Sequence, residues 1–309
     1  MDFRGSQSDP SPTFTLAAIL VVVITWGVVS PLVKLASFDG PALSAYRLWI
    51  GAAALCAVML WARRMPDRAT LRFAIPAGLI FGVNVMFFVV GIKLTTVANA
   101  TLIGALQPAI VLLVAGRWFG ETVTRREVTC VAVAIAGVAI VIVGSAGVPE
   151  WNPLGDLMAL MAVLTFIGYF LISKRARATV DTLDYMTAVH VAAALVVTPL
   201  ALARPGELRP EGASDVFIVL FFALVSGTLG QLVIGWTQRY VDVSLSSLLL
   251  LGVPVVAAGA AWLMLGESLG PLQLLGGAIT LAGIGAMLWR PARAPSPRVE
   301  WEAVGAGDG

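Results

Sequence analysis

A few polar and aromatic side chains interrupt the long apolar runs of this sequence, and they are the groups able to bind a small molecule there. Trp26 and Ser30 share the first run, and Arg47 lies near the start of the second. Because a polar side chain inside a membrane is costly, each such residue needs a structural or functional reason. The further candidates for a substrate-binding site are Asn84, Gln107, Tyr169, Gln231 and Trp236.

Arg47 places a positive charge inside an apolar run. It follows Pro41 by six residues, which is about 9 Å along a helix that rises about 1.5 Å per residue. Two interpretations stay open. The long side chain can snorkel to the membrane surface, or the guanidinium can form a pair of hydrogen bonds with a substrate carboxylate.

Aromatic residues within the runs suggest what kind of solute would fit. Trp26, Phe88, Phe166, Tyr169 and Trp236 could line a flat, apolar cavity suited to aromatic or amphipathic solutes, and they could equally serve packing between helices. Trp26 and Tyr169 are the first choices for a binding role. Other tryptophans lie at the ends of runs, where an aromatic belt at the membrane surface accounts for them.

Catalytic chemistry is disfavoured by what the runs lack. Intramembrane catalysis usually needs several His, Asp, Glu or Ser side chains within hydrogen-bond reach, whereas His190 is the single histidine and the acidic residues fall in loops, tails or helix ends. No lysine follows a glycine, so a P-loop for ATP is absent. Cys56 and Cys130 have no metal-ligand spacing. We therefore expect no catalytic residue, no cofactor and no metal site.

The composition makes the lipid bilayer the solvent of this chain. Of the 309 residues, 59% are hydrophobic and 12% are charged, which is more apolar surface than a soluble domain could bury. The net charge of +2 gives no reason to expect a nucleic-acid partner. A membrane-spanning helix needs roughly 20 mostly apolar residues. Ten runs meet this length: Leu16 to Leu35, Ala42 to Trp61, Leu71 to Leu94, Ala98 to Phe119, Val128 to Ser145, Leu157 to Ser173, Leu183 to Ala203, Val216 to Thr237, Leu245 to Leu265 and Pro271 to Trp289.

One apolar segment occurs twice in the sequence. It contains Pro108 and Glu121 in its first copy and Pro254 and Glu267 in its second, with the same offset of 146 positions, 254 minus 108. Such duplications are typical of secondary transporters. Ten spans then divide into two sets of five, and an odd number of spans per half makes the second half enter the membrane from the opposite side. The predicted fold is an all-α membrane protein with two inverted five-helix repeats.

The duplication also sets the expected domains. We expect a cytoplasmic segment at 1–13, a first repeat at 14–146, a second repeat at 147–290 and a disordered cytoplasmic tail at 291–309. Pro108 and Pro254 each lie inside a predicted helix, where proline removes a backbone hydrogen bond and bends the helix. Two interpretations stay open for this pair: a bend that serves packing, or a paired hinge or gate between the repeats.

The basic residues predict the orientation. If the N-terminus is cytoplasmic, most of the 20 lysines and arginines fall on the inner side, which the positive-inside rule favours. Both termini are then cytoplasmic, Glu121 lies at the inner side and Glu267 at the outer side. Lys34 and Lys174 hold matching places at helix ends and are expected to anchor or pair, while the two glutamates are expected to form a hydrogen-bonded turn.

Local signals predict how some helices begin and pack. Thr124 with Glu127 forms the pattern of a capping box, and Pro271 suits the first turn of a helix. Gly78 and Gly82 are spaced four residues apart, which favours close contact between helices.

Taken together, these features make the sequence resemble the EamA type of the drug/metabolite transporter superfamily over about residues 13–290. The resemblance depends on Trp26 with Gly27, on the opening of the second helix from Pro41 to Arg47, and on the repeated proline followed by glycine and glutamate. It implies a multi-pass carrier of the plasma or inner membrane, often an exporter of amino acids, metabolites or drugs, with a central cavity and alternating access.

Three functions are compatible with these features. The first is a secondary transporter that exports or facilitates movement of a small organic solute, driven by the gradient of that solute because no mid-membrane carboxylate relay is present. The second is a membrane scaffold or sensor without transport, and the third is an intramembrane enzyme. The expected partners are a small-molecule substrate and the bilayer, and a homodimer stays open.

Overall fold

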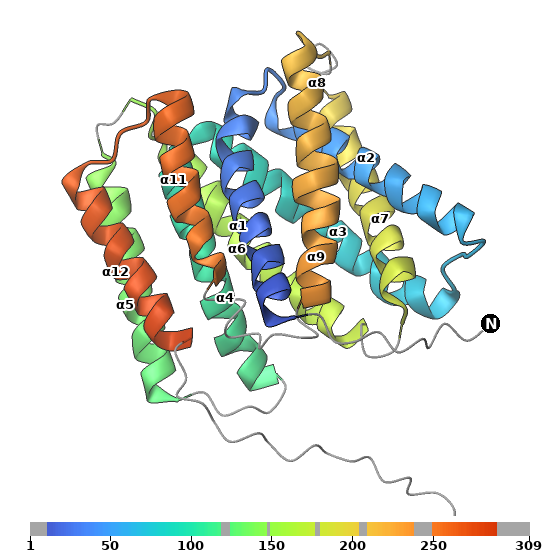
Figure 1. Ribbon diagram of the computed structural model, residues 1–309, viewed down its shortest axis with the longest axis horizontal. Helices are drawn as coiled ribbons and strands as arrows, with labels where there is room; N and C mark the ends of the chain where they lie inside the picture. The colour runs from blue at the N-terminus through green and yellow to red at the C-terminus, as the bar shows by residue number, and fades with distance from the viewer. Residues whose placement is uncertain are drawn as a thin grey trace, which may run out of the picture.

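The computed structural model describes residues 11–118, 124–146, 149–176, 180–203, 209–237 and 249–288, and within these ranges the chain is helical, with no strand. Figure 1 shows a bundle of mostly upright helices. They are α1 (Pro12–Leu35), α2 (Gly40–Trp61), α3 (Arg68–Leu94), α4 (Val97–Trp118), α5 (Arg125–Gly144), α6 (Pro153–Ala176), α7 (Thr182–Leu202), α8 (Ala213–Leu220), the π-helix η2 (Phe221–Leu229), α9 (Gly230–Thr237), α11 (Gly252–Leu265) and α12 (Pro271–Leu288).

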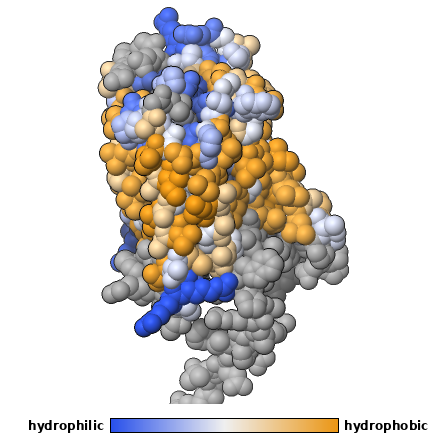
Figure 2. All heavy atoms as spheres, turned by 90° about the vertical axis from the view of Figure 1, so that its left-hand side faces the viewer, coloured by the Kyte–Doolittle hydropathy of each residue, from blue (hydrophilic) through white to orange (hydrophobic). Residues whose placement is uncertain are grey.

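Seven helical stretches of the described chain are long and apolar enough to cross a membrane. One of them, Ala213–Ile234, runs through α8, η2 and α9, and three shorter apolar helices accompany the seven. Figure 2 shows an apolar band between hydrophilic ends on the face of α5 and α12. Val133 and Ile135 of α5 and Leu274 and Leu275 of α12 are exposed large apolar residues. Such a band matches the hydrocarbon core of a bilayer.

Side chains at the helix starts account for where several helices begin. Asp39 accepts from Ala42 N at the start of α2 and Asp67 from Thr70 N at the start of α3, each at 2.7 Å. The bonds from the Thr70 side chain and backbone lower the pKa of the Asp67 carboxyl. The predicted capping box of α5 is confirmed, with Thr124 N bonded to Glu127 Oε2 at 2.7 Å. Helix α12 begins at Pro271, as predicted.

Glycines bring α3 against α6 and α7. A Cβ at Gly78 would lie 2.6 Å from Val189 O, and one at Gly82 would lie 2.6 Å from Ala193 O, both on α7. A Cβ at Gly91 would lie 2.9 Å from Ala159 N on α6. The predicted close helix contact is confirmed, and this seam joins the two parts of the chain on either side of residue 147.

Helices α5 and α12 meet through contacts that recur with the two partners exchanged. Gly137 of α5 lies against Thr280 of α12, and Gly283 of α12 lies against Ala134 of α5. Positions 134 and 280 differ by the same 146 as positions 137 and 283, so each contact is the copy of the other. In addition, Thr280 Oγ1 donates to Ala134 O at 3.4 Å.

The relative direction of α5 and α12 shows which symmetry relates their two sets of contacts. Arg126 at the start of α5 donates through Nη2 to Ala286 O near the end of α12, at 3.0 Å. At the other end, Gly144 lies against Leu272. The helices therefore run antiparallel, and the axis that exchanges them crosses the helices instead of running along them.

The prolines of the repeated segment lie in different surroundings. The described helix α11 begins at Gly252, so Pro254 lies in its first turn. The chain is also helical at 249–250, and a turn at Leu251 interrupts the helical backbone three residues before Pro254, which is where a proline bends a helix. Whether this bend serves as a hinge or gate stays a prediction. Pro108 lies within α4, and its side chain is outside the described residues.

Gly137→Ala is expected to lower the melting temperature of the protein in detergent. Its Cβ would lie 2.5 Å from Thr280 Oγ1 and 2.6 Å from Thr280 N, and overpacking of this kind costs about 1–3 kcal/mol. Gly285→Ala on α12 is the matched control, because a Cβ there meets no atom within 4 Å. Equal melting temperatures for the two variants would contradict the described packing of α5 on α12.

Candidate functional site

Arg47 on α2 packs between aromatic rings inside the bundle. Its guanidinium carbon lies 4.6 Å from the ring centre of Phe222 on η2 and 5.9 Å from that of Phe81 on α3. These distances are those of cation–π contacts. The side chain is thus directed toward the neighbouring helices and not along the membrane surface, which disfavours the snorkelling interpretation.

The charge of Arg47 has no carboxylate partner in the described part of the chain. The ion pairs found there join Lys34 with Glu267, and Arg64 with Asp181 and Asp184. A phenyl ring attracts a cation but does not neutralise it, so the N–H groups of this guanidinium stay suited to an anion. Arg47 therefore offers a site for a negatively charged group of a solute.

The π-helix η2 positions the residues that surround Arg47. Thr228 Oγ1 donates to Ala223 O, five residues earlier, at 2.9 Å. π-helical turns are rare and often lie at functional sites. A Cβ at Gly227 would lie 3.2 Å from Arg47 Nε, so glycine lets the guanidinium approach the backbone of η2. The sequence analysis missed Phe222 and Gly227, because no local pattern signals a π-helix.

Trp26 reaches the same π-helix from α1. Its indole Nε1 donates to Ser226 O at 2.8 Å. A Cβ at Gly230 would lie 2.5 Å from this Nε1, so the indole fits only because residue 230 is glycine. Trp26 and Arg47 therefore contact neighbouring residues of η2, Ser226 and Gly227, from two different helices.

Aromatic residues of α3, α6 and α7 complete this region. The Tyr169 ring lies over Phe81 with centroids 4.7 Å apart, and Phe166 contacts Tyr169 at 5.7 Å. The His190 ring meets the edge of Phe81 at 5.7 Å, and its Nδ1 lies 2.8 Å from Met186 O. We call Trp26, Arg47, Phe81, Tyr169 and Phe222 the central site.

Several predicted site residues have other partners. Asn84 Nδ2 donates to Ala162 O at 2.6 Å and so joins α3 to α6. Ser30 Oγ donates to Trp26 O of its own helix at 3.4 Å. Gln107 and Gln231 are half-buried on α4 and α9. The side chain of Trp236 lies outside the described residues.

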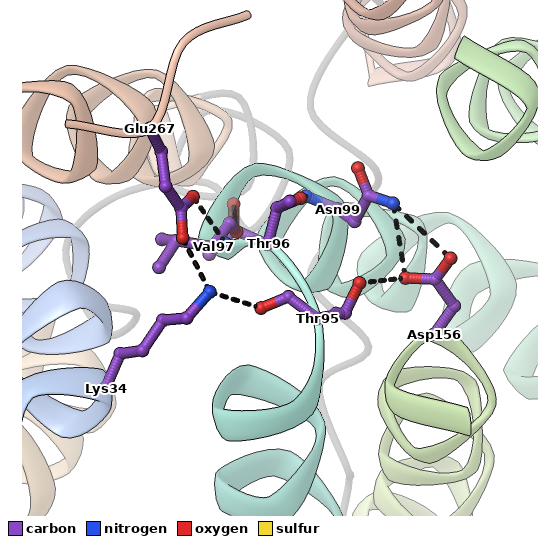
Figure 3. Close-up of polar contacts among 8 residues, drawn as sticks. Lys34, Thr95, Thr96, Val97, Asn99, Asp156 and Glu267 are labelled. Carbon is purple, nitrogen blue, oxygen red and sulfur yellow. Dashed lines mark hydrogen bonds and ion pairs between the residues drawn. The ribbon is translucent and has the colours of Figure 1, made fainter. Parts of the chain in front are cut away.

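A second polar cluster closes one end of the bundle, where α1, α3 and α11 end and α4, α6 and α12 begin. Figure 3 shows its core. Lys34 Nζ pairs with Glu267 Oε1 at 2.6 Å and also donates to Thr95 O at 2.7 Å. Val97 N, at the start of α4, donates to Glu267 Oε2 at 2.9 Å. Glu267 thereby joins the ends of α1 and α11 to the start of α4.

Asp156 at the start of α6 holds the other side of the same turn (Figure 3). Its carboxylate accepts from Thr95 Oγ1 at 2.8 Å and from Asn99 Nδ2 at 3.2 and 3.3 Å. Trp151 Nε1 also donates to it at 2.7 Å. Asp156 and Glu267 are both buried, and both come from the later part of the chain. We call Lys34, Thr95, Val97, Asn99, Asp156 and Glu267 the end cluster.

Gly266 explains how Glu267 reaches this cluster. It ends α11 with φ +70°, a left-handed conformation that favours glycine. The expected pairing of Lys34 is confirmed. Glu267, which was expected in a hydrogen-bonded turn, is hydrogen-bonded just after the end of α11, with partners on α1 and at the start of α4. Glu121 and the side chain of Lys174 lie outside the described residues.

Comparisons with known proteins agree with this architecture. The model of the EamA-like transporter family matches residues 13–143 and 153–289. A probable terminal-alkyne amino-acid exporter of Streptantibioticus cattleyicolor is 25% identical over 86% of this chain and 91% of its own length. A probable amino-acid metabolite efflux pump of Salmonella typhimurium is 26% identical over the same shares of the two chains.

A known crystal structure shares the fold, with a TM-score of 0.60 and 21% identity over 90% of this chain and 98% of the other. The two matches of the family model fall on either side of residue 147 and include the central site and the end cluster. The chain belongs to the EamA-like transporter family and is a multi-pass membrane transporter.

Proposed function

We propose that this transporter exports or facilitates the movement of small organic carboxylates, with amino acids and their derivatives as the foremost class. The observation that carries the proposal is the Arg47 guanidinium between Phe81 and Phe222, with no carboxylate partner in the described residues. Two relatives named as exporters of amino acids or their metabolites support this class. Other metabolites and drugs that carry a carboxylate fit the same chemistry.

The ring contacts suggest how such a solute would be recognised. A guanidinium binds a carboxylate through two parallel N–H···O bonds in its own plane, while its faces stay free for aromatic rings. The Arg47 guanidinium carbon lies 4.6 Å from the ring centre of Phe222, and the aromatic rings of Tyr169 and Trp26 belong to the same central site. An amino acid with an apolar or aromatic side chain would satisfy both features.

We further propose alternating access between two inverted repeats, at 14–146 and 147–290, that together make ten membrane spans in the plasma or inner membrane. The exchanged, antiparallel contacts of α5 and α12 support the inversion. With both termini cytoplasmic, as the basic residues favour, the end cluster lies at the outer side. Its bonds join the two repeats, so they would break when the outer side opens.

Arg47→Ala is expected to reduce counterflow of amino acids in proteoliposomes by about tenfold or more, since hydrogen bonds to charged groups contribute about 1.5–3 kcal/mol. Arg47→Lys keeps the charge but loses the geometry for two parallel hydrogen bonds. Its counterflow should lie between that of the parent protein and that of Arg47→Ala. Arg64→Ala, which removes an arginine paired with Asp184 away from the site, is the control. Amines without a carboxylate that exchange as well as the amino acids would refute the proposed substrate class.

Glu267→Gln is expected to open the outer side more often, because Lys34 loses its ion-pair partner. The measurement is labelling of a cysteine at Ala98 by a membrane-impermeant maleimide, in a variant without Cys56 and Cys130. Loss of about 1.4 kcal/mol of closing energy corresponds to tenfold more of the open form.

Two variants test whether this effect belongs to the pair. Glu150→Gln removes an exposed charge that lines one cavity together with Ala98 and Glu267, and it should leave the labelling rate unchanged. Exchange of the charges, with Lys34→Glu and Glu267→Lys together, should restore slow labelling. A Glu267→Gln variant that labels as slowly as the parent would show that the pair does not close this side.

A further inference from the structure

His190 on α7 lies next to the central site. Its ring centre is 5.7 Å from that of Phe81, and the Arg47 guanidinium carbon is 5.9 Å from the same ring centre. A Cβ at Gly51 would lie 3.7 Å from His190 Nε2. Gly51 follows Arg47 by one turn of α2, and residues four apart lie on the same face of a helix. His190 Nε2 is therefore directed toward the face of α2 that carries Arg47.

The hydrogen bond at Nδ1 decides what the other ring nitrogen of His190 can do. Nδ1 lies 2.8 Å from Met186 O, and a carbonyl oxygen only accepts, so Nδ1 carries a hydrogen. His190 is buried and has no carboxylate partner among the described residues. Because an unpaired buried charge is costly, the ring is neutral and Nε2 is an acceptor. No group of the described chain donates to this nitrogen.

Thr228 on η2 supplies a second acceptor at the same place. Its hydroxyl donates its one hydrogen to Ala223 O at 2.9 Å, so the oxygen can only accept from any further group. A Cβ at Gly51 would lie 3.1 Å from this oxygen. Thr228 and His190 thus approach one point of α2 from two different helices, and only a glycine leaves room for both.

The central site therefore has two chemically opposite parts, about one helical turn apart. Arg47 has N–H groups without a carboxylate, whereas His190 and Thr228 have lone pairs without a donor. The first part suits an anion and the second suits an ammonium. An α-amino acid carries both groups on one carbon. Arg47 and Trp26 are only half-buried, so part of their surface stays accessible within the bundle.

We propose that His190 Nε2 and Thr228 Oγ1 bind the ammonium of an α-amino acid whose carboxylate is bound by Arg47. This inference rests on the proposed function, because it requires the carboxylate at Arg47. A solute with a carboxylate alone would leave both acceptors without a donor, and a buried acceptor without a partner is costly. His190 and Thr228 thereby select α-amino acids from the wider class of small organic carboxylates.

Competition in proteoliposomes that contain the full chain tests this selection. The labelled solutes are leucine, phenylalanine and tryptophan, each measured by counterflow. The competitors are the same amino acid, unlabelled, and its analogue without the ammonium, such as 3-phenylpropionate for phenylalanine. We expect half-inhibition by the analogue to need a concentration about tenfold higher or more, as for the loss of hydrogen bonds to a charged group.

The outcomes separate this inference from the proposed function. Equal inhibition by the amino acid and its analogue would overturn the role of His190 and Thr228 and leave the carboxylate class intact. Absence of counterflow for all three amino acids would refute the proposed function, and this inference with it.

Two variants of His190 test the acceptor itself. His190→Asn can keep a donor for Met186 O, but its side chain is too short to place an acceptor where Nε2 lies. This variant should inhibit equally with the amino acid and with the analogue. His190→Gln can place its amide oxygen near the position of Nε2 and should retain most of the preference. Equal weakening of both competitors by His190→Asn would show a structural role and overturn the proposal.

Thr228→Val provides a test that does not depend on the folding of the histidine variants. It should weaken inhibition by the amino acid by about fivefold, as for the loss of one hydrogen bond, and leave inhibition by the analogue unchanged. Thr129→Val on α5 is the matched control, because Thr129 Oγ1 also donates to its own helix, to Arg125 O at 2.9 Å. A Thr228→Val variant with the parent's preference would contradict the assignment of this hydroxyl.

Discussion

The cost of an unsatisfied polar group in hydrocarbon governs this structure. In a bilayer core a backbone or side-chain polar group has no water to bond, so it must find a partner within the protein. Asn84 bonds to a carbonyl of α6, Trp26 bonds to a carbonyl of η2, and Glu267 receives both Lys34 and the start of α4. Arg47 differs from these groups, because among the described residues its guanidinium has aromatic rings and no carboxylate beside it, and the proposed function depends on this difference.

The two parts of the chain share a plan but differ in how tightly they pack. Glycines let α3 lie directly on α6 and α7, and the positions 146 residues after Gly78 and Gly82 hold Leu224 and Thr228. The later span instead contains a π-helix, and α11 stands apart from α12. The two parts of the chain therefore differ at the positions that pack α3 tightly, and the later part contains the π-helix beside Arg47.

Features that depend on neighbouring residues could be predicted from the sequence. Apolar runs predicted the helices, Thr124 and Glu127 predicted a capping box, and Gly78 and Gly82 predicted a close helix contact. The resemblance carried by the repeated motif predicted the family. Each of these signals lies within a few residues of chain or in a direct repeat.

Features that depend on distant residues could not be predicted. Lys34 and Glu267 are 233 positions apart, and nothing near either residue names its partner. In the sequence, Phe222 and Gly227 are indistinguishable from other residues of an apolar helix. Their contact with Arg47 depends on the π-helix, which the sequence does not indicate.

The π-helix also makes the chain sensitive to its own length. A π-helical turn arises when one residue more than an α-helix needs is accommodated between two helical ends. Loss of a single residue from Phe221–Leu229 would allow a regular α-helix between the same two ends, in which the side chains of this segment point in other directions. Phe222 would then lose its contact with Arg47, and Ser226 would lose its hydrogen bond with Trp26. In this membrane protein a deletion of one apolar residue, which most membrane spans tolerate by tilting, would dismantle the central site.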